Sequence, residues 1–470
     1  MQLTMASSAY ATLSSPVLSL SRAFGKSFTL SNLVWDKFVL FARAAVCAAL
    51  ARGIVRGQIE ITDAHGTQIF GQQELSKGTR SASIRVKDDA FWVRVYLWYD
   101  IGFSEAFMAG EFESPDLKEV LNIYIDNLSG LNGPLASTFY KLHSAAETLI
   151  IRFSHGFSMA VENVAGYEAS NDLYCSFLSQ EMMYSCPIWG DEEGGVRGDL
   201  DGHRRPGDLE SAQDRKIQYV LRKARLRPGD RLLEIGSGWG GVAIAAAKMG
   251  CTVDTITLSV EQMNGARERV KEAGLENQVR VHLMDYRNLP SDWEKAFDAC
   301  ISIEMLEAVG IEWMSTYISK IDWALKNERA AVVLTATCYP ESFYTPYQGN
   351  DFVRKYHWPK CVIPSATSLI VDFQKTSKGR FCVDSVEDFG VHYPRCLREW
   401  GRRLDENWTP ELQASLEVKH PALKDPHNLA MFKRKWYYMY LYMEVAYSRK
   451  WLNLVTWTFS RPMDAAVSSA

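Results

Sequence analysis

The sequence has little of what marks several large classes of protein. Its 470 residues carry a formal net charge of −4, which gives no case for the concentrated basic surface that nucleic-acid binding requires. The nine cysteines are scattered and form no CxxC pair. This spacing excludes the common zinc motifs, so we expect free thiols in a reducing compartment and no metal site.

Long apolar runs are also missing. The stretch VLFARAAVCAALARGIV is interrupted by Arg43 and Arg52, so it is too short between charges to cross a bilayer. It predicts an amphipathic helix instead. The residues before it are rich in serine, threonine and alanine and hold no acid before Asp36, which weakly resembles a transit peptide. An unstructured tail over residues 1–34 is the favoured interpretation, and we expect a cytoplasmic protein, soluble or peripheral on membranes.

The length favours two folded units, because single cores stop growing near this size. Residues 35–150 are predicted to form a small α+β domain, with a helix starting at Ser114 and Pro115. Its strand candidates alternate apolar and polar residues: QIEIT, TQIFG, ASIRV and FWVRVYLW. Residues 151–470 would form the second domain, entered through a helical connection over 135–164. The glycine-rich segment 190–208 predicts a mobile surface loop.

Strands alternate with helices from Arg231 to Thr335. This pattern predicts an α/β domain with a Rossmann-like, mostly parallel seven-stranded sheet and helices on both faces, and ligands at the carboxyl ends of the strands. Five strands are RLLEI, TVDTITL, VRVHL, DACISI and AAVVLT, and two later runs, RFCVDSVEDFG and LVTWTFSRP, would close the sheet antiparallel. The segment 338–371 and the aromatic helix KWYYMYLYMEVAYSRKW would cover the strand ends.

A glycine-rich turn, LLEIGSGWGG (232–241), follows the first of these strands. Glycines let a ligand approach the backbone without a Cβ in the way, which suits a nucleotide-like cofactor. The spacing is GxGxGG, and Asp254 lies inside the second strand instead of at its tip. Because a dinucleotide site needs GxGxxG and an acid at that tip, an oxidoreductase is disfavoured.

Ordered motifs carry a family resemblance. LLEIGSGWGG, ITLSVEQ, DYRNLP and SIEMLEAVG follow one another, flanked upstream by AFMAGEFESPDL, YEASND and YSC and downstream by FGVHYPRCLREW and FSRP. In this order they resemble the cyclopropane-fatty-acyl-phospholipid synthase family of S-adenosylmethionine-dependent methyltransferases, and its plant-like branch most. The resemblance spans roughly residues 35–465.

The resemblance implies where S-adenosylmethionine binds. The cofactor's amino-acid end would lie at Gly236 and Gly238, with Tyr184 and Ser185 closing over it. Its ribose would meet Thr257 and Gln262, and its adenine would lie beside Asp285. Small polar groups suit a zwitterionic nucleoside without phosphates, although ordinary strand-end and helix-cap polarity also explains Thr257 and Gln262.

The implied reaction is methyl transfer to a carbon–carbon double bond, followed by removal of a proton. In the family the base is thought to be a bound bicarbonate, and the matching positions for its cradle are Cys186, Glu307 and Tyr393. Each has a plainer interpretation: an inert packed thiol, a first-turn dipole partner beside Glu304, and a buried tyrosine with a satisfied hydroxyl.

Departures from the family pattern weaken the bicarbonate assignment more than the methyltransferase one. Bacterial members carry histidines where this chain has Ala308 and Thr335. Gly166 and Glu168 replace a histidine and an aspartate, which leaves substrate detail in that segment open.

The predicted function is therefore methylation of unsaturated phospholipid acyl chains at a membrane surface, giving cyclopropane fatty acids. Loss of a different proton would give a methylene or methyl-branched chain, and a related scaffold methylates amines in plant alkaloid synthesis. A silent lipid-binding protein is the non-enzymatic alternative. The N-terminal domain would serve membrane contact, substrate presentation or contacts within a homodimer. Acyl length, double-bond position and headgroup are not readable from the residues.

Overall fold

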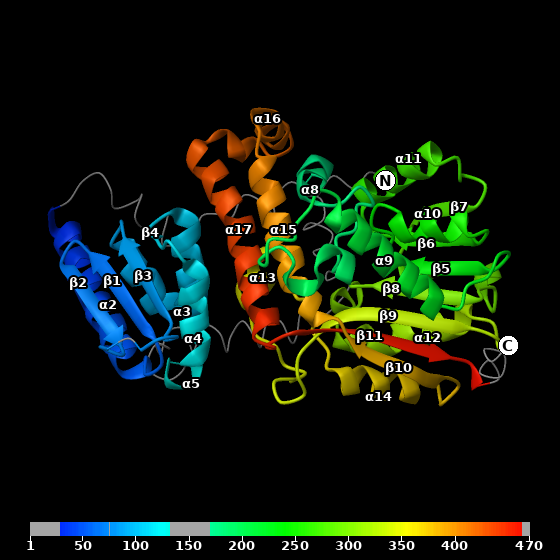
Figure 1. Ribbon diagram of the computed structural model, residues 1–470, viewed down its shortest axis with the longest axis horizontal. Coiled ribbons are helices and arrows are strands. Elements are labelled where there is room, and N and C mark those ends of the chain that lie inside the picture. Colours follow the sequence, from blue (N-terminus) through cyan, green and yellow to red (C-terminus); the bar gives the residue numbers. More distant parts are fainter. Residues whose placement is uncertain (1–28, 75, 132–169, 463–470) are drawn as a thin grey trace. The chain divides into compact units, whose positions relative to one another are not determined.

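The computed structural model describes residues 29–74, 76–131 and 170–462 and divides into two compact units, 1–144 and 145–470 (Figure 1). Three expectations concern residues outside the described part: the tail up to residue 28, the helical connection over 135–164, and the departures at Gly166 and Glu168. Helix α2 (Thr29–Gly53) begins within the segment expected to be an unstructured tail.

The first unit contains a four-stranded sheet in the order β2-β1-β3-β4. Strand β1 pairs antiparallel with β2 and parallel with β3, and β3 pairs antiparallel with β4. The strands are β1 (Gln58–Asp63), β2 (Gly66–Gly71), β3 (Ser81–Val86) and β4 (Phe112–Glu113). The helices that follow α2 are α3 (Ala90–Ala109), α4 (Leu117–Asp126) and α5 (Leu128–Leu131).

One strand prediction in this unit is wrong, because FWVRVYLW lies inside helix α3. The alternation that suggests a strand depends on Arg94 facing solvent, but its side chain is buried and paired with Glu105 and Glu111. Phe91, Trp92 and Val93 are buried too, so the helix is covered on most of its surface. In the sequence, a charged residue that is buried in an ion pair therefore looks the same as a solvent-facing residue of a half-exposed strand.

Helix α2 buries one face, although its outer side is not consistently polar, since Leu40 and Phe41 are exposed. Val39, Ala42, Val46 and Ala49 are buried and recur at intervals of three and four residues, which places them on one face of the helix. Within the described ranges, no helix is long and apolar enough to cross a membrane.

Helix α4 is capped two residues later than predicted, and the cap gives a test. The carboxylate of Asp116 accepts a hydrogen bond from the Glu119 amide at 3.1 Å, whereas Ser114 makes no such contact among the described residues. Replacing Asp116 with alanine should destabilise the helix by about 1 kcal/mol. Amide hydrogen exchange over α4 should accelerate correspondingly in Asp116→Ala and stay unchanged in Ser114→Ala; equal effects would contradict the assignment of the cap.

The second unit contains the predicted seven-stranded sheet, in the order β10-β11-β9-β8-β5-β6-β7. The five strands from β9 to β7 are parallel neighbours, and β11 pairs antiparallel with both β9 and β10, as predicted. The strands are β5 (Arg231–Ile235), β6 (Thr252–Thr257), β7 (Val279–Leu283), β8 (Ala299–Ile303), β9 (Ala331–Cys338), β10 (Cys382–Asp388) and β11 (Asn453–Ser460).

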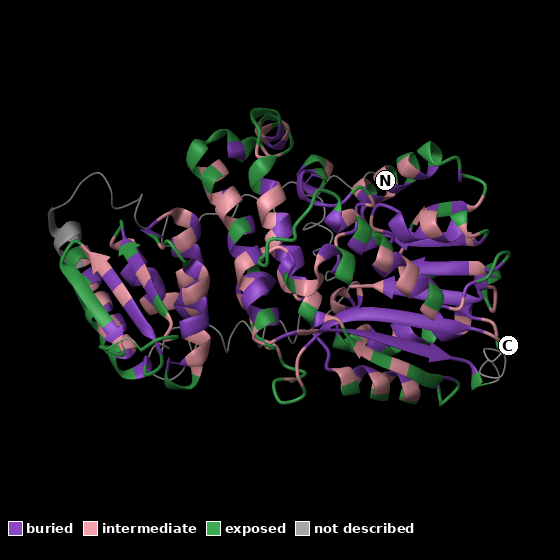
Figure 2. Ribbon diagram, in the orientation of Figure 1, coloured by how far each residue is buried: buried purple, intermediate pink, exposed green. Residues whose placement is uncertain are grey.

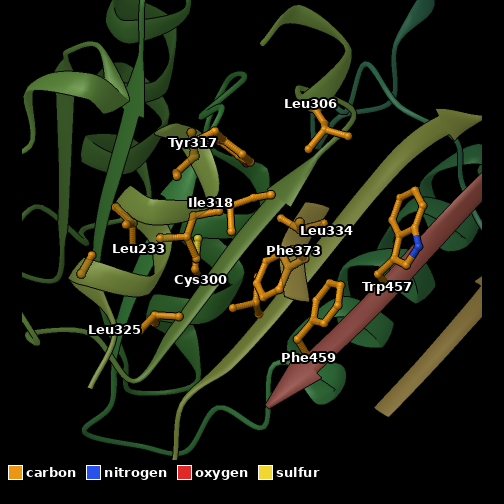
Figure 3. Packing of buried hydrophobic residues seen from close by; sticks show 14 of the residues in the cluster. Leu233, Cys300, Leu306, Tyr317, Ile318, Leu325, Leu334, Phe373, Trp457 and Phe459 are labelled. Carbon is orange, nitrogen blue, oxygen red and sulfur yellow. The ribbon is translucent and has the colours of Figure 1, made fainter. Parts of the chain in front are cut away.

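Helices cover both faces of this sheet, so its central strands are buried (Figure 2). Neighbouring residues of β5 point to opposite faces of the sheet and so belong to different cores. Leu232 packs on one face with α9 (Asp208–Lys223), α10 (Gly241–Lys248) and α11 (Val260–Glu272). Leu233 packs on the other face with α12 (Met314–Ala324) and α14 (Ala366–Thr376). Figure 3 shows the second core, in which Phe373 of α14 stacks on Phe459 of β11 with ring centroids 3.9 Å apart.

The remaining helices lie near one end of the sheet. Figure 1 shows α15 beside α17 there, and the two pack together. Their bounds, with those of the shorter helices, are α8 (Asn171–Phe177), α13 (Phe352–Tyr356), α15 (Tyr393–Glu406), α16 (Pro410–Lys419) and α17 (Pro426–Ser448).

The segment 190–208 is held more firmly than the prediction of a mobile loop implies. It contains two 3-10 turns, and Glu193, the last residue of the first turn, is buried and bonded to Arg215 of α9 at 2.7 Å. Arg395 of α15 donates to the carbonyl groups of Glu193 and Gly195 at 2.6 and 2.5 Å. Both arginines come from later elements, so glycine content alone could not indicate this anchoring.

Candidate active site

An open cavity lies where strands β5, β6 and β8 end. Its walls come from the glycine-rich turn, the segment after β6, the YSC segment and the turn after β8. Six of the seven predicted cofactor residues line it: Tyr184, Ser185, Gly236, Gly238, Thr257 and Gln262. The structure therefore brings together residues from three separate motifs at the edge of the sheet where ligands of parallel α/β folds bind.

Gly236 is needed at its position for two reasons. Its φ of +100° is rarely adopted by residues with a side chain, and a Cβ there would lie 3.2 Å from both Cβ and Cγ of Met305. The amides of Gly236 and Ser237 both donate to the carbonyl of Ile256, so they anchor the turn to β6. Gly236 thus contributes space to the cavity, while its own N–H group donates to the Ile256 carbonyl and not to a ligand.

Thr257 and Gln262 hold each other at the cavity wall. The Thr257 hydroxyl donates to Oε1 of Gln262 at 2.8 Å. The helix cap in this segment is Ser259, whose Oγ accepts from the Gln262 amide at 3.2 Å. The Thr257 hydroxyl also accepts from the Ser259 amide at 3.2 Å, so it has a local structural role as well as facing the cavity with Gln262.

Loss of the Thr257 hydroxyl should weaken cofactor binding. Thr257→Val keeps the shape of the side chain but removes the donor to the buried Gln262 carbonyl and the acceptor of the Ser259 amide, so the dissociation constant for S-adenosylmethionine should rise about tenfold. Calorimetric titration measures this change. Thr252→Val, at the other end of the same strand, is the matched control; an equal loss in both variants would mean that the strand, and not the pair, is responsible.

Asp285 lies just outside this cavity. Its neighbours Met284 and Tyr286 line the cavity, but Asp285 is not one of the described residues that line it. Its carboxylate accepts from the Arg287 amide at 2.8 Å and pairs with the Arg287 guanidinium. In this position, Asp285 shapes the turn that presents its two neighbours to the cavity.

Glu234 is a cavity residue that the sequence motifs do not single out. It is buried in β5, and burial raises the pKa of its carboxyl to about 8. Its Oε2 has no hydrogen-bond partner among the described residues. A buried acceptor without a donor suits a cationic ammonium group, such as the one at the amino-acid end of S-adenosylmethionine. The signal available in the sequence was an acid in an otherwise apolar strand, directly before the glycines.

A second cavity adjoins the first. Apolar and aromatic side chains dominate its walls, which come from α13, α15, α17 and the turn after β8; they include Trp358, Trp400, Leu397, Met439, Tyr442, Met443, Ala446, Trp451 and Leu452. Three residues line both cavities: Tyr184, Glu304 and Ala308. The second cavity suits a long apolar substrate whose reacting part reaches these shared residues.

Two buried carboxylates lie at this junction. Oε1 of Glu307 accepts from the Thr337 amide at 2.6 Å, while its Oε2 is buried without a hydrogen-bond partner in the described part of the chain. Burial first, and then the charge of Glu304, raise the pKa of Glu307 to about 7. Glu307 belongs to a three-residue 3-10 turn, so a partnership with a helix dipole does not explain it.

Cys186 and Tyr393, predicted to surround a small anion with Glu307, are instead bonded to Glu304. The Cys186 amide donates to Oε1 of Glu304 at 2.9 Å, and the Tyr393 hydroxyl donates to Oε2 at 2.5 Å. Tyr393 lines the apolar cavity together with Glu307, whereas Cys186 is not among the described residues that line either cavity. Its thiol lies 3.4 Å from the Pro187 carbonyl, and burial raises its pKa well above the ordinary value.

The two positions that depart from the bacterial pattern have different surroundings. Ala308 lines both cavities, so the missing histidine leaves space at the junction. Thr335 is buried in β9, where its hydroxyl lies 3.1 Å from that of Thr456. No group of three or more histidine, cysteine or acidic side chains among the described residues could hold a metal ion.

Comparison with known proteins identifies the family. Residues 158–421 match the family described as mycolic acid cyclopropane synthetase. The chain belongs to this family. It is accordingly an S-adenosylmethionine-dependent methyltransferase of the cyclopropane-synthase type, as the motif resemblance implied.

Two curated relatives cover most of the chain. The tuberculostearic acid methyltransferase of Mycobacterium tuberculosis is 29% identical and covers 89% of this chain and 92% of its own length. The cyclopropane-fatty-acyl-phospholipid synthase of Escherichia coli is 30% identical over 71% of this chain and 79% of its own.

Solved structures support the fold. A cyclopropane synthase from Mycobacterium tuberculosis aligns with a TM-score of 0.52 at 20% identity, over 64% of this chain and 98% of that one. Coclaurine N-methyltransferase aligns with a TM-score of 0.57 at 16% identity, over 77% of this chain and 99% of its own. The predicted Rossmann-like methyltransferase fold is confirmed.

Proposed function

We propose that this protein transfers the methyl group of S-adenosylmethionine to the double bond of an unsaturated phospholipid acyl chain, which then closes to a cyclopropane. The observation that carries the proposal is the junction of two cavities at Tyr184, Glu304 and Ala308, one beside the glycine-rich turn and the other walled mainly by aromatic and aliphatic side chains. A cofactor in the first cavity and an acyl chain in the second would meet beside two buried carboxylates. The Escherichia coli relative is named for this reaction.

The residues present fit the cofactor. Gly236 and Gly238 would leave room for its amino-acid end, with Tyr184 and Ser185 above it and the free Oε2 of Glu234 available to its ammonium group. Thr257 and Gln262 would meet the ribose, and we retain Asp285 as the proposed neighbour of the adenine. Bound there, S-adenosylmethionine would supply an electrophilic methyl group.

The chain's own residues would hold the alkene in position, exclude water and stabilise the positive charge that the reaction creates. An alkene is a weak nucleophile, so it must be held in line with the methyl group in a site without water. The aromatic and aliphatic walls of the second cavity exclude water and orient the acyl chain. Attack leaves a positive charge on the second alkene carbon, and Glu307 and Tyr393 would stabilise it or help to move the proton that must leave.

A second outcome of the same cation also has support. The tuberculostearic acid methyltransferase matches more of this chain than the Escherichia coli synthase does, 89% against 71%. A hydride shift that moves the positive charge to the methylated carbon, followed by loss of a proton from the added methyl group, would give a methylene chain, which a separate reductase could convert to a methyl branch. Proton magnetic resonance of the product distinguishes the upfield methylene protons of a cyclopropane from the vinylidene protons of a methylene chain.

We further propose a two-domain enzyme that works at the cytoplasmic membrane surface, with residues 35–150 as a separate domain, 151–470 as the methyltransferase domain, and a homodimer as the assembled state. Leu40 and Phe41 of α2 are half exposed, which suits an apolar partner such as a lipid surface. Cosedimentation with vesicles and light scattering measure these two properties. A monomer that stays in the supernatant would contradict both.

The substrate class is tested with labelled cofactor. Vesicles of a monounsaturated phospholipid should become labelled, whereas vesicles of the matched saturated phospholipid and a panel of amines should not. Label in amines alone would favour a small-molecule methyltransferase. Cofactor binding without labelling of any acceptor would favour a silent lipid-binding protein.

A further inference from the structure

The donors predicted to cradle bicarbonate are occupied by a side chain of this protein. The Cys186 amide and the Tyr393 hydroxyl each bond to one oxygen of Glu304, so the cradle does not fit a separate bicarbonate ion. We propose that the Glu304 carboxylate takes the place expected for bicarbonate and is itself the base that removes a proton from the transferred methyl group. The inference rests on the proposed function and names the base at that same site.

Glu304 lies where such a base must act. It lines both cavities, whereas Glu307, the other carboxylate at the junction, lines only the second one. Each Glu304 oxygen accepts one bond from its donor, and a carboxylate oxygen has two lone pairs. One lone pair on each oxygen is therefore available to a proton while the two donors keep the carboxylate in place.

The backbone at Glu304 is built for this placement. Its φ of 48° lies in the left-handed region, which is uncommon for a residue with a side chain. The Glu304 amide donates to the Thr335 carbonyl at 2.7 Å and fixes this conformation at the end of β8. Such conformations persist only where the surroundings enforce them, and they concentrate at functional sites.

The electrostatic surroundings make Glu304 a stronger base than an exposed carboxylate. Burial raises its pKa above the ordinary value of 4.5, while the bonds from Tyr393 and Cys186 and the charge of Lys216 oppose the rise. Lys216 is buried and donates to Ser185 at 2.5 Å. These contacts favour the ionised form in a site that would otherwise neutralise it.

The proton transfer balances without another reactant. A C–H bond of the added methyl group breaks, and its electron pair forms the second ring bond to the cationic carbon. The proton passes to Glu304, whose charge is neutralised as the cation disappears. Release of that proton to solvent restores the carboxylate for the next turnover.

The test compares the wild type with Glu304→Gly and Glu304→Gln in buffer freed of carbon dioxide. Glycine accepts the positive φ and empties the cradle, whereas glutamine keeps the volume without the charge. Wild-type turnover on monounsaturated phospholipid vesicles should not respond to added bicarbonate. The kcat of both variants should be at least about 100-fold below that of the wild type. Added bicarbonate should raise kcat at least about tenfold in Glu304→Gly and should leave it unchanged in Glu304→Gln.

Binding gives a readout that does not require turnover. Saturation-transfer magnetic resonance with ¹³C-labelled bicarbonate should detect bound anion in Glu304→Gly and none in the wild type. Equal bicarbonate binding by both proteins, or wild-type turnover that depends on bicarbonate, overturns the proposal. Wild-type protein that labels no lipid under any condition defeats the proposed function instead, and the binding result still decides whether Glu304 fills the cradle. Glu312→Gln, an exposed site on the following turn, controls for loss of surface charge.

Discussion

Replacing Glu307 with glutamine is expected to lower kcat by about 100-fold or more while making the protein more stable above neutral pH. The loss follows because Glu307 is the second carboxylate at the junction, and its Oε2 is buried facing no donor among the described residues. A residue kept only for packing would not combine lost activity with gained stability. This combination marks a group retained for function at a cost in stability.

The pH dependence of that stability has a definite sign. Burial and the nearby charge of Glu304 raise the pKa of Glu307 from 4.5 to about 7 in the folded protein. Its contribution to stability is therefore fully present below pH 4.5 and is lost as the pH rises through 7. Glutamine stays neutral throughout, so Glu307→Gln should exceed the wild type by up to about 3 kcal/mol at alkaline pH.

Urea unfolding at a series of pH values measures this difference. The two proteins should have similar unfolding free energies in acid and diverge as the pH rises, whereas Glu312→Gln should track the wild type at every pH. A Glu307→Gln protein that is less stable than the wild type at alkaline pH would contradict this expectation, because it would show that a partner stabilises the ionised carboxylate.

Placing alanine at Gly236 should weaken S-adenosylmethionine binding by about 100-fold, because the turn would have to move to relieve its strain. A side chain at φ +100° is strained, and its Cβ would meet Met305 at 3.2 Å on the cavity wall. Displacement of Met305 would then narrow the space next to Glu304.

Gly229→Ala is the matched control for this variant. Gly229 has a similar φ of +90°, but no described heavy atom lies within 4 Å of a Cβ placed there. Both variants should lose about 1–3 kcal/mol of stability from backbone strain, and only Gly236→Ala should lose cofactor affinity in calorimetric titration. Parallel loss of affinity in both would mean that general destabilisation explains the effect.

Much of the methyltransferase fold was predictable because its strands are short apolar runs separated by helices. This pattern predicted five parallel strands and the antiparallel pair that extends the sheet. In the first unit, the alternation of apolar and polar residues gave a wrong strand prediction at FWVRVYLW, where the buried pairing of Arg94 with Glu111 resembles an exposed strand position. Charge partners distant in sequence leave no periodic signal, and the anchoring of segment 190–208 was missed for the same reason.

The site was predictable where its residues lie in local motifs. Six of the residues predicted to bind the cofactor line one cavity because each lies at or just after a strand end or belongs to the YSC segment. The contacts of Glu304 were hidden because its donors, Cys186 and Tyr393, lie 118 and 89 residues away along the chain. For Cys186 the plain interpretation holds for the thiol, which is packed and buried, while its backbone amide makes the important contact.

The central claim is that a transferred methyl group loses a proton beside the buried carboxylates. The most direct test is wild-type turnover of a monounsaturated phospholipid with S-adenosylmethionine that carries a fully deuterated methyl group, followed by mass spectrometry of the acyl chains. The claim predicts a product that keeps two of the three deuterium atoms, in the unsaturated lipid only. A product that keeps all three, or label found only in an amine, would contradict it.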